Sequence, residues 1–184
     1  MINILFIGNS HTYYNDMPLM VQERAIEEGY ECRVVMNAHG GWFLAQHADE
    51  PDVRFNILNG NYDYVVLQEH AHPFGPVEKF RKAAILLCTL IKDAGSRAVL
   101  YETWAKRSEP EMQARMNEAH RQVAEDTGAL LAPVGEYWWE YQKSQPQAKM
   151  YARDGAHPSA EGSDFAAKWI WETIREDLNK KESD

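Results

Sequence analysis

Three side chains near the two ends of the chain have the chemical types needed for acyl transfer. Ser10 lies near the N-terminus in the segment Gly-Asn-Ser-His-Thr, and Asp154 and His157 share one short segment near the C-terminus. A serine hydroxyl is a weak nucleophile until a neighbouring base takes its proton. A carboxylate beside a histidine base holds the imidazole tautomer and stabilises the cation that forms. The sequence therefore predicts a nucleophile (Ser10), a base (His157) and an orienting carboxylate (Asp154).

Acyl transfer also needs hydrogen-bond donors aimed at the negative charge that develops on the carbonyl oxygen. The sequence offers three kinds of donor: the backbone N–H of Ser10, the backbone N–H of Gly40 or Gly41, and the side-chain amide of Gln68. Two adjacent glycines let the backbone approach a ligand closely, although such a pair can also be a simple turn. We expect Ser10, Gly40, Gly41 and Gln68 to form the oxyanion hole.

Four further polar residues flank these candidates: Asn9, His11, Glu69 and His70. We interpret them as support for the site. Alternatives stay open for some of these roles. Glu69 could instead form a salt bridge, Gln68 could only hydrogen-bond the strand ends, and His70 could replace Gln68 as an oxyanion donor, because an imidazole also carries an N–H.

The candidate residues follow segments that have the character of buried strands. Residues 1–7 are almost continuously apolar, which is typical of a strand covered on both faces, and Ser10 follows within three residues. Four later segments are also strand-like: residues 31–36, 62–67, 97–102 and 129–133. Ligands bind at the carboxyl edge of such sheets, so Ser10, the glycine pair and Gln68 each follow a strand at the expected edge.

Helical patterns or helix signals separate the strand-like segments. They cover residues 16–28, 42–59, 76–94 and 108–127, and a last helix begins after Ser159. Residues 108–111 have the spacing of a capping box, whereas residues 135–151 are aromatic without a clear period. This alternation indicates a three-layer α/β/α sandwich with a five-stranded parallel sheet and right-handed crossovers. The flavodoxin-like strand order 2-1-3-4-5 would bring the first three strand ends together.

Length and composition limit the classes of function. With 184 residues, we expect one domain spanning residues 1–184. A formal net charge of −9 without a basic cluster argues against nucleic-acid binding. Cys32 and Cys88 are expected to be buried free thiols, which suits a reducing compartment. Without a signal peptide or an apolar segment of membrane-spanning length, the expected location is cytoplasmic, away from membranes. The oligomeric state is left open.

Two other groups of residues have less specific patterns. Five histidines invite a metal interpretation, but no tight ligand motif or cysteine cluster accompanies them, so we expect no metal; they are His11, His39, His47, His70 and His72. Several aromatic residues could stack on a sugar or line an acyl pocket, although most such residues belong to cores; they are Trp42, Phe43, Trp104, Trp138, Trp139 and Tyr151.

At the level of motifs, the chain resembles the SGNH (GDSL-like) hydrolases. The segment Gly-Asn-Ser-His-Thr around Ser10 is similar to their first block, and Asp-Gly-Ala-His, ending at His157, is similar to their last block. Gly40 and Gly41 fall where the glycine block lies. The resemblance implies the same sandwich fold, an esterase, lipase or carbohydrate deacetylase activity, and a reaction without metal; we expect no cofactor.

The chain departs from the family pattern in two places. Asn9 stands where aspartate is more common, and this change is mild because Ser10 does the chemistry. The usual third block, Gly-x-Asn-Asp, is replaced by Leu-Gln-Glu-His, residues 67–70. This pattern resembles an atypical branch with a Gln-Glu pair after strand three, and that resemblance makes Gln68 the amide that would replace the asparagine.

These observations predict a serine esterase that forms an acyl-enzyme on Ser10 and releases it with water. The expected partner is a small-molecule or carbohydrate ester carrying a short acyl or acetyl group. Two other functions remain as alternatives: a non-catalytic carbohydrate-binding descendant of the fold, and a flavodoxin-like nucleotide or FMN binder. The second is weakened because the loop at Ser10 lacks a serine- and threonine-rich phosphate cradle.

Overall fold

The chain folds around one parallel sheet of five strands. The structure, a computed structural model, describes residues 1–183 of the 184. The strands are β1 (Ile2–Gly8), β2 (Cys32–Ala38), β3 (Tyr64–Gln68), β4 (Arg97–Tyr101) and β5 (Leu130–Ala132). Their order is β2-β1-β3-β4-β5, and every neighbouring pair is parallel. The predicted sheet and strand order are therefore confirmed.

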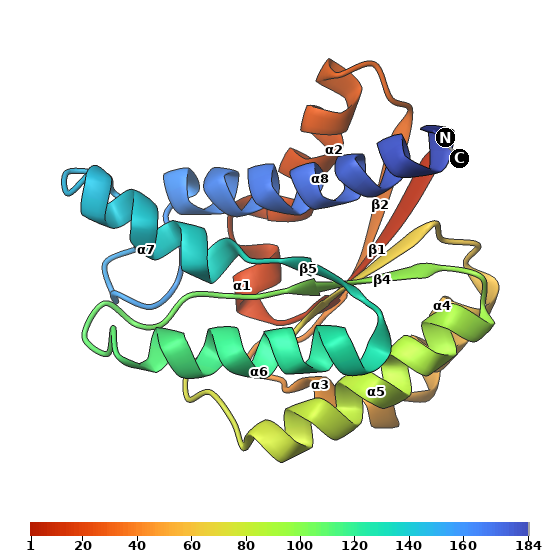
Figure 1. Cartoon of the computed structure of the whole chain (residues 1–184), viewed down its shortest axis with the longest axis horizontal. Helices are drawn as coiled ribbons and strands as arrows, with labels where there is room; N and C mark the ends of the chain where they lie inside the picture. Colours follow the sequence, from red (N-terminus) through yellow and green to blue (C-terminus); the bar gives the residue numbers. More distant parts are fainter. Residues whose placement is uncertain (184) are drawn as a thin grey trace.

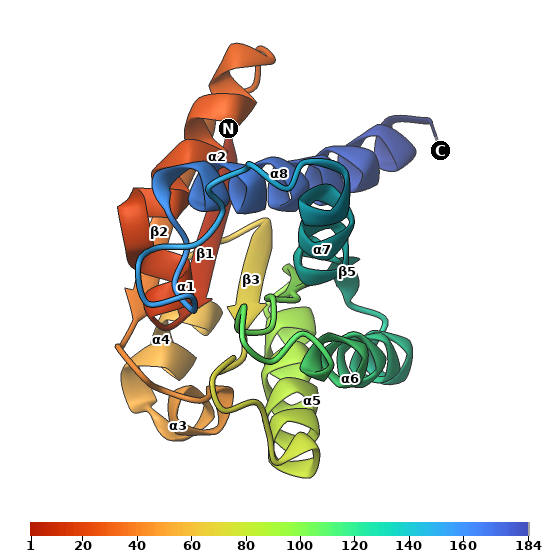
Figure 2. The same cartoon turned by 90° about the vertical axis from the view of Figure 1, so that its left-hand side faces the viewer.

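Helices cover both faces of this sheet (Figures 1 and 2). One layer holds α2 (Met17–Glu27), α7 (Val134–Ser144) and α8 (Ala160–Ser183). The opposite layer holds α3 (Leu44–Asp49), α4 (Pro51–Asn59), α5 (Val77–Asp93) and α6 (Met112–Thr127). A short helix α1 (Ser10–Tyr13) and a 3-10 turn η1 (Tyr14–Asp16) follow β1 at the edge of the sheet. The predicted α/β/α sandwich is confirmed.

The alternation of side chains along the strands divides the core in two. Leu5 of β1 belongs to the cluster beneath α5, and its neighbour Phe6 belongs to the cluster beneath α8. All five residues of β3 are buried. Because both faces of the central strands are covered, these strands are continuously apolar rather than alternating. This burial fixes the carboxyl ends of β1 and β3 side by side.

Two helix boundaries differ from the sequence-based expectation. The segment 135–151 has no clear period, yet residues 135–144 belong to α7. Val134 and Trp138 of this helix lie one turn apart and are fully buried. The capping box expected at residues 108–111 is not used: α6 begins only at Met112, after backbone turns at residues 106–112, and Glu111 makes no capping hydrogen bond. Ser159 does cap α8, because its hydroxyl accepts the Gly162 N–H at 3.1 Å.

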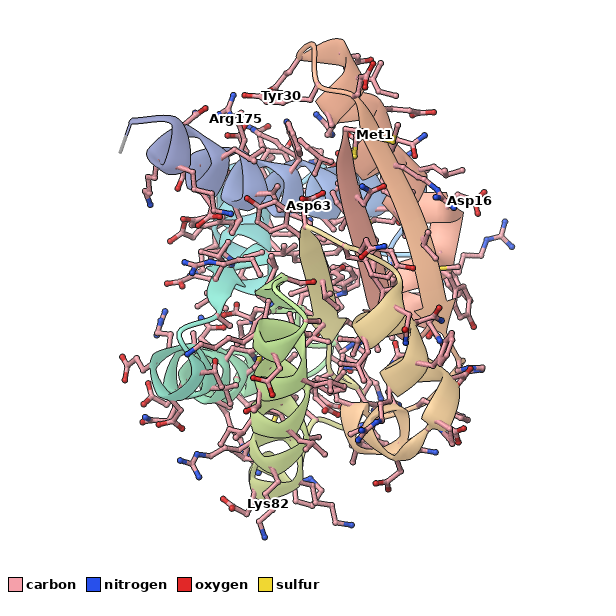
Figure 3. The ribbon with its side chains drawn as sticks, turned by 90° about the vertical axis from the view of Figure 1, so that its right-hand side faces the viewer. Met1, Asp16, Tyr30, Asp63, Lys82 and Arg175 are labelled. Atoms are coloured by element: carbon pink, nitrogen blue, oxygen red, sulfur yellow. The ribbon has the colours of Figure 1, made fainter. Side chains whose placement is uncertain are left out.

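The amino end of the sheet, seen in Figure 3, is closed by polar contacts to α8. Asp63 lies there, immediately before β3. The Tyr64 hydroxyl donates to the Asp177 carboxylate at 2.9 Å, and Arg97 and Lys181 pair with that carboxylate at 3.4 and 2.9 Å. These contacts attach the last turns of α8 to the strand starts, at the end of the sheet opposite Ser10.

Two further expectations concern cysteines and membranes. Both cysteines are free; Cys88 is buried, and Cys32 is only half-buried. Within residues 1–183, no helix combines the length and the apolar character that a membrane crossing requires.

Candidate active site

The turn after β1 holds Ser10 at the carboxyl edge of the sheet. Gly8 is needed there because a Cβ on it would lie 2.6 Å from Oε1 of Gln68. Asn9 is 1% exposed; its Oδ1 accepts the His11 N–H at 3.1 Å, and its Nδ2 donates to the Trp42 carbonyl at 2.9 Å. Ser10 is thus the first residue of α1, on a turn that the Asn9 side chain holds through two hydrogen bonds.

The structure brings Ser10 and His157, which are 147 residues apart, into direct contact. Ser10 Oγ lies 2.8 Å from His157 Nε2, and His157 Nδ1 lies 2.6 Å from Asp154 Oδ2. When Nδ1 carries the proton and donates it to the carboxylate, Nε2 is left as the acceptor for the serine hydroxyl. This is the chain of contacts that nucleophilic activation of a serine requires.

Asp154 is held ionised by its own loop. Its Oδ1 accepts the backbone N–H groups of Ala156 and His157, each at 3.0 Å. Partial desolvation raises the pKa of Asp154, but the hydrogen bonds from the His157 ring and from these two amides outweigh it and bring the pKa to about 2. Asp154 therefore stays negative wherever an imidazole can titrate.

The ring of His157 lies between two other rings. Tyr14 stacks on one side, with ring centres 4.4 Å apart and planes 10° apart, and His11 stacks at 5.1 Å and 29°. Tyr14 was not among the candidates from the sequence. The one available signal was its spacing, four residues after Ser10, which places both residues on one side of a helical turn.

His11 belongs to a buried aromatic wall behind His157. Its ring contacts those of His72 and Trp104, with centres 4.9 and 5.4 Å apart, and Trp104 Nε1 donates to the Ala156 carbonyl at 2.9 Å. Burial, with smaller contributions from neighbouring histidines, lowers the pKa of His11 well below its usual value, and burial lowers that of His72 to about 4. Both imidazoles are therefore neutral beside His157.

The glycine pair lies against the nucleophile turn. The His39 N–H donates to the Gly8 carbonyl at 3.0 Å, and Gly41 adopts a φ of +74°, which favours glycine. Within the described part of the chain, the N–H groups of Ser10, Gly40 and Gly41 have no acceptor. Three backbone donors are thus unpaired at this edge of the sheet.

Gln68 is placed differently from the expectation. It is fully buried; its Oε1 accepts the Asn9 N–H at 2.8 Å and the Thr12 hydroxyl at 2.9 Å, and its Nε2 donates to the Glu69 carbonyl. An oxyanion donor must point toward the substrate carbonyl. This amide instead contacts the nucleophile turn with its oxygen and the Glu69 backbone with its nitrogen. These contacts favour a positioning role for Gln68 over the expected role as an oxyanion donor.

Glu69 and His70 also make internal contacts. Glu69 accepts the N–H groups of Leu44 and His70 at 3.3 and 2.8 Å, and burial raises its pKa to about 7. His70 Nδ1 lies 3.1 Å from the Pro73 carbonyl, and its ring stacks on Phe43 at 4.3 Å. These two contacts hold the His70 ring within its own loop.

The remaining histidines and aromatic candidates are mostly structural. His47 is fully buried, with Nε2 2.8 Å from the Gly8 carbonyl and a pKa lowered by burial to about 4. No group of three or more potential ligand side chains within the described residues is arranged to hold a metal. Trp104, Trp138 and Tyr151 are core residues; Trp42, Phe43 and Trp139 are half-buried.

Comparisons with known proteins found relatives among solved structures. No family model and no curated protein matches the chain. Among solved structures, a protein from Slackia heliotrinireducens described as an SGNH hydrolase is 32% identical, with 94% of this chain and 98% of that chain covered and a TM-score of 0.82.

Two more distant structures share the fold. A carbohydrate esterase family 3 protein from Talaromyces cellulolyticus is 14% identical, with 98% and 99% of the two chains covered and a TM-score of 0.78. An acetyl xylan esterase from Geobacillus stearothermophilus is 20% identical, with 94% of each chain covered and a TM-score of 0.66. Together with the identity and coverage of the first match, the fold and the motif order show that this chain belongs to the SGNH hydrolases, a family of serine hydrolases.

Proposed function

We propose that the chain is a serine esterase in which Ser10 is the nucleophile, His157 the general base and Asp154 the residue that orients the imidazole. One observation carries this proposal: the continuous contact from Ser10 Oγ to His157 Nε2 and from His157 Nδ1 to Asp154. Two hydrogen bonds shorter than 3 Å would let the imidazole take the serine proton as the new bond forms.

In the proposed mechanism, Ser10 Oγ attacks the ester carbonyl carbon while His157 Nε2 takes the hydroxyl proton. The tetrahedral intermediate then collapses, the bond to the alcohol oxygen breaks, and His157 gives its proton to the departing alcohol. Water attacks the acyl-serine with His157 again acting as base. Collapse of the second intermediate releases the carboxylic acid and returns the proton to Ser10.

We propose that backbone groups stabilise the oxyanion. The N–H of Ser10 and an N–H of the Gly40–Gly41 pair are unpaired among the described residues, and the loop that carries the pair is tied to the nucleophile turn. Preorganised donors of this kind stabilise charge that appears only in the transition state. Gln68 supports the hole indirectly, because it fixes the Asn9 N–H and hence the direction of the neighbouring Ser10 amide.

We propose a carbohydrate ester with an acetyl or other short acyl group as the substrate. Support comes from structural neighbours whose names are those of a carbohydrate esterase and an acetyl xylan esterase. Residues 1–184 would act as one domain without metal or cofactor, and the Gln-Glu pair would mark a branch of the family.

The test combines labelling and turnover. A fluorophosphonate probe should modify Ser10, located by mass spectrometry, and the protein should release acetate from acetylated xylo-oligosaccharides. Ser10→Ala should remove both signals. Labelling of another serine, or acetate release that survives in Ser10→Ala, would overturn the mechanism. Saccharide binding without labelling or turnover would instead support the non-catalytic alternative.

A further inference from the structure

A concave surface lies between α7 and the first half of α8, outside the residues of the candidate active site. This α7–α8 groove has a volume of about 720 Å³, and four aromatic side chains line it: Tyr137, Tyr141, Phe165 and Trp169. Figure 1 shows α7 beside the first half of α8 at the left, and Figure 2 shows α7 beneath α8. The sequence analysis did not identify this surface.

The four rings form two facing pairs. Tyr137 and Tyr141 lie one helical turn apart on α7, and Phe165 and Trp169 lie one turn apart on α8. Tyr137 packs against Trp169 with ring centres 4.3 Å apart and planes tilted by 51°, and the ring centre of Tyr141 lies 5.2 Å from that of Phe165. Each ring remains partly exposed, and Tyr141 is 36% exposed. The exposed parts of these rings form an aromatic surface along the groove.

Three carboxylates and one lysine line the groove, and within the described residues Asp164 is the one carboxylate among them that forms an ion pair. Asp164 pairs with Arg24 at 2.5 Å, Glu161 accepts the Lys149 N–H at 3.0 Å, and the Lys168 ammonium lies 4.9 Å over the Trp169 ring. An internal cation thus occupies the position that a cationic ligand would take on Trp169. A second copy of the chain would bring acidic walls together, and each chain already carries a net charge of −9.

The groove also has polar groups that are free to hydrogen-bond the hydroxyl groups of a ligand. Within the described part of the chain, the Glu140 carboxylate and the hydroxyls of Tyr137 and Tyr141 make no hydrogen bond or ion pair. A carboxylate accepts from sugar hydroxyls, and a phenol can donate or accept. Partly exposed rings with apolar faces and polar tips provide flat contact area for the C–H face of a pyranose ring.

We propose that the α7–α8 groove binds the neutral carbohydrate chain of the substrate, at sugar units beyond the one that carries the reacting ester. The identity of the occupant rests on the proposed function, whereas the groove itself does not. Stacking on the Tyr141 and Tyr137 rings would hold the sugar faces, and Glu140 would accept their hydroxyls.

The groove is connected to the proposed catalytic loop through Met150. Met150 lines the groove and accepts the Ser159 N–H at 2.9 Å, and Ala152 donates to the His157 carbonyl at 2.9 Å. These two antiparallel contacts attach one wall of the groove to the loop that carries His157. The proposal requires an oligosaccharide long enough to extend from the groove to Ser10.

The binding experiment uses the full chain and neutral, unacetylated oligosaccharides. Isothermal titration calorimetry with xylohexaose and cellohexaose should show saturable binding of at least one of them at millimolar concentration. Tyr141→Ala should weaken that binding by about 3- to 10-fold, the contribution of one aromatic contact. Tyr141→Phe keeps the ring and should lose less. Phe55→Ala, which removes a 67% exposed ring on α4, is the matched control and should bind like the wild type.

Kinetics separate this inference from the proposed function. Acetylated xylohexaose is long enough to contact the groove while its ester reacts, whereas 4-nitrophenyl acetate is not. The kcat/KM for acetylated xylohexaose divided by that for 4-nitrophenyl acetate should therefore fall at least threefold in Tyr141→Ala. The same ratio should stay constant in Phe55→Ala. Hydrolysis of both esters without saccharide binding or a changed ratio would overturn the groove while the esterase survives. Saccharide binding that depends on Tyr141 without any ester hydrolysis would support the groove and overturn the esterase. Binding of oligolysine in place of both saccharides would overturn the carbohydrate assignment.

Discussion

The two halves of the candidate active site are held in place in opposite ways. The nucleophile turn is buried and fixed by residues far away in the sequence. Asn9 is 1% exposed, and its N–H donates to Gln68, 59 residues later. The loop with the base is exposed and fixed mainly by its own backbone: the side chains of Asp154 and His157 are 48% and 26% exposed, and they are three residues apart.

The two halves should respond differently to substitution. The nucleophile turn depends on the sheet, because Gln68 ends β3 and His47 of α3 contacts the Gly8 carbonyl. The base loop holds Asp154 with its own backbone N–H groups, accepts hydrogen bonds from Trp104 and Arg107 at its carbonyls, and packs its histidine against Tyr14. Changes to the buried residues that support Ser10 should therefore lower both activity and stability, whereas changes to Asp154 and His157 should affect mainly activity.

The largest effect should come from the nucleophile itself. Ser10→Ala should lower kcat for 4-nitrophenyl acetate by more than about 10³-fold, because the acyl-enzyme cannot form. Its unfolding temperature should match that of the wild type, since the lost hydroxyl only contacts His157. Circular dichroism melting and initial rates test both statements. A variant that keeps most of its rate would remove Ser10 from the mechanism.

The next effect concerns the orienter. Asp154→Asn should lower kcat by roughly 10³–10⁴-fold with a smaller change in KM, because the imidazole loses the carboxylate that stabilises its cation. In the wild type, kcat/KM should fall on the acid side with a single ionisation of imidazole, since Asp154, with a pKa of about 2, stays ionised there. The free energy of unfolding of Asp154→Asn near neutral pH should be close to that of the wild type. A pH-independent rate would contradict this pair.

Gln68 tests the buried half of the comparison. Gln68→Ala leaves the Asn9 N–H and the Thr12 hydroxyl without their buried acceptor, which costs about 1–3 kcal/mol for an unsatisfied group. The melting temperature should fall by about 2–4 °C for each kcal/mol, together with kcat. Gln122→Ala, at an exposed glutamine, is the control. A large loss of kcat at unchanged stability would restore Gln68 as an oxyanion donor.

A smaller effect is expected at the stacking partner of His157. Tyr14→Ala should reduce kcat/KM by about 3- to 10-fold, the value of one aromatic contact. Tyr14→Phe retains the ring and should keep most of the rate. If the Tyr14 hydroxyl were the important group, Tyr14→Phe would lose as much rate as Tyr14→Ala. Equal losses in both variants would argue that stacking does not position His157.

The smallest effect should follow metal removal. Exhaustive treatment with a chelator should leave the hydrolysis of 4-nitrophenyl acetate unchanged, because the proposed mechanism uses only protein groups. Rates before and after dialysis against the chelator provide the measurement. Activity that is lost and then recovered with zinc would support a histidine metal site instead.

Much of this molecule follows from the sequence alone. Continuous apolar segments identified β1 and β3, because strands covered on both faces need no polar side, and the alternation of strands and helices indicated the sheet order. Asp154 and His157 could be paired by their spacing, since a three-residue separation in a loop with glycine brings both side chains to one place.

The tertiary structure decided the features that depend on which side chains meet across the fold. Gln68 lies at the expected strand end, but only the packing of β1 on β3 shows that its amide turns inward to hold Asn9. Tyr14 meets His157, and α7 meets α8, through contacts between residues distant in the sequence. Local pattern determines which residues reach the sheet edge; long-range packing determines the direction in which each side chain points.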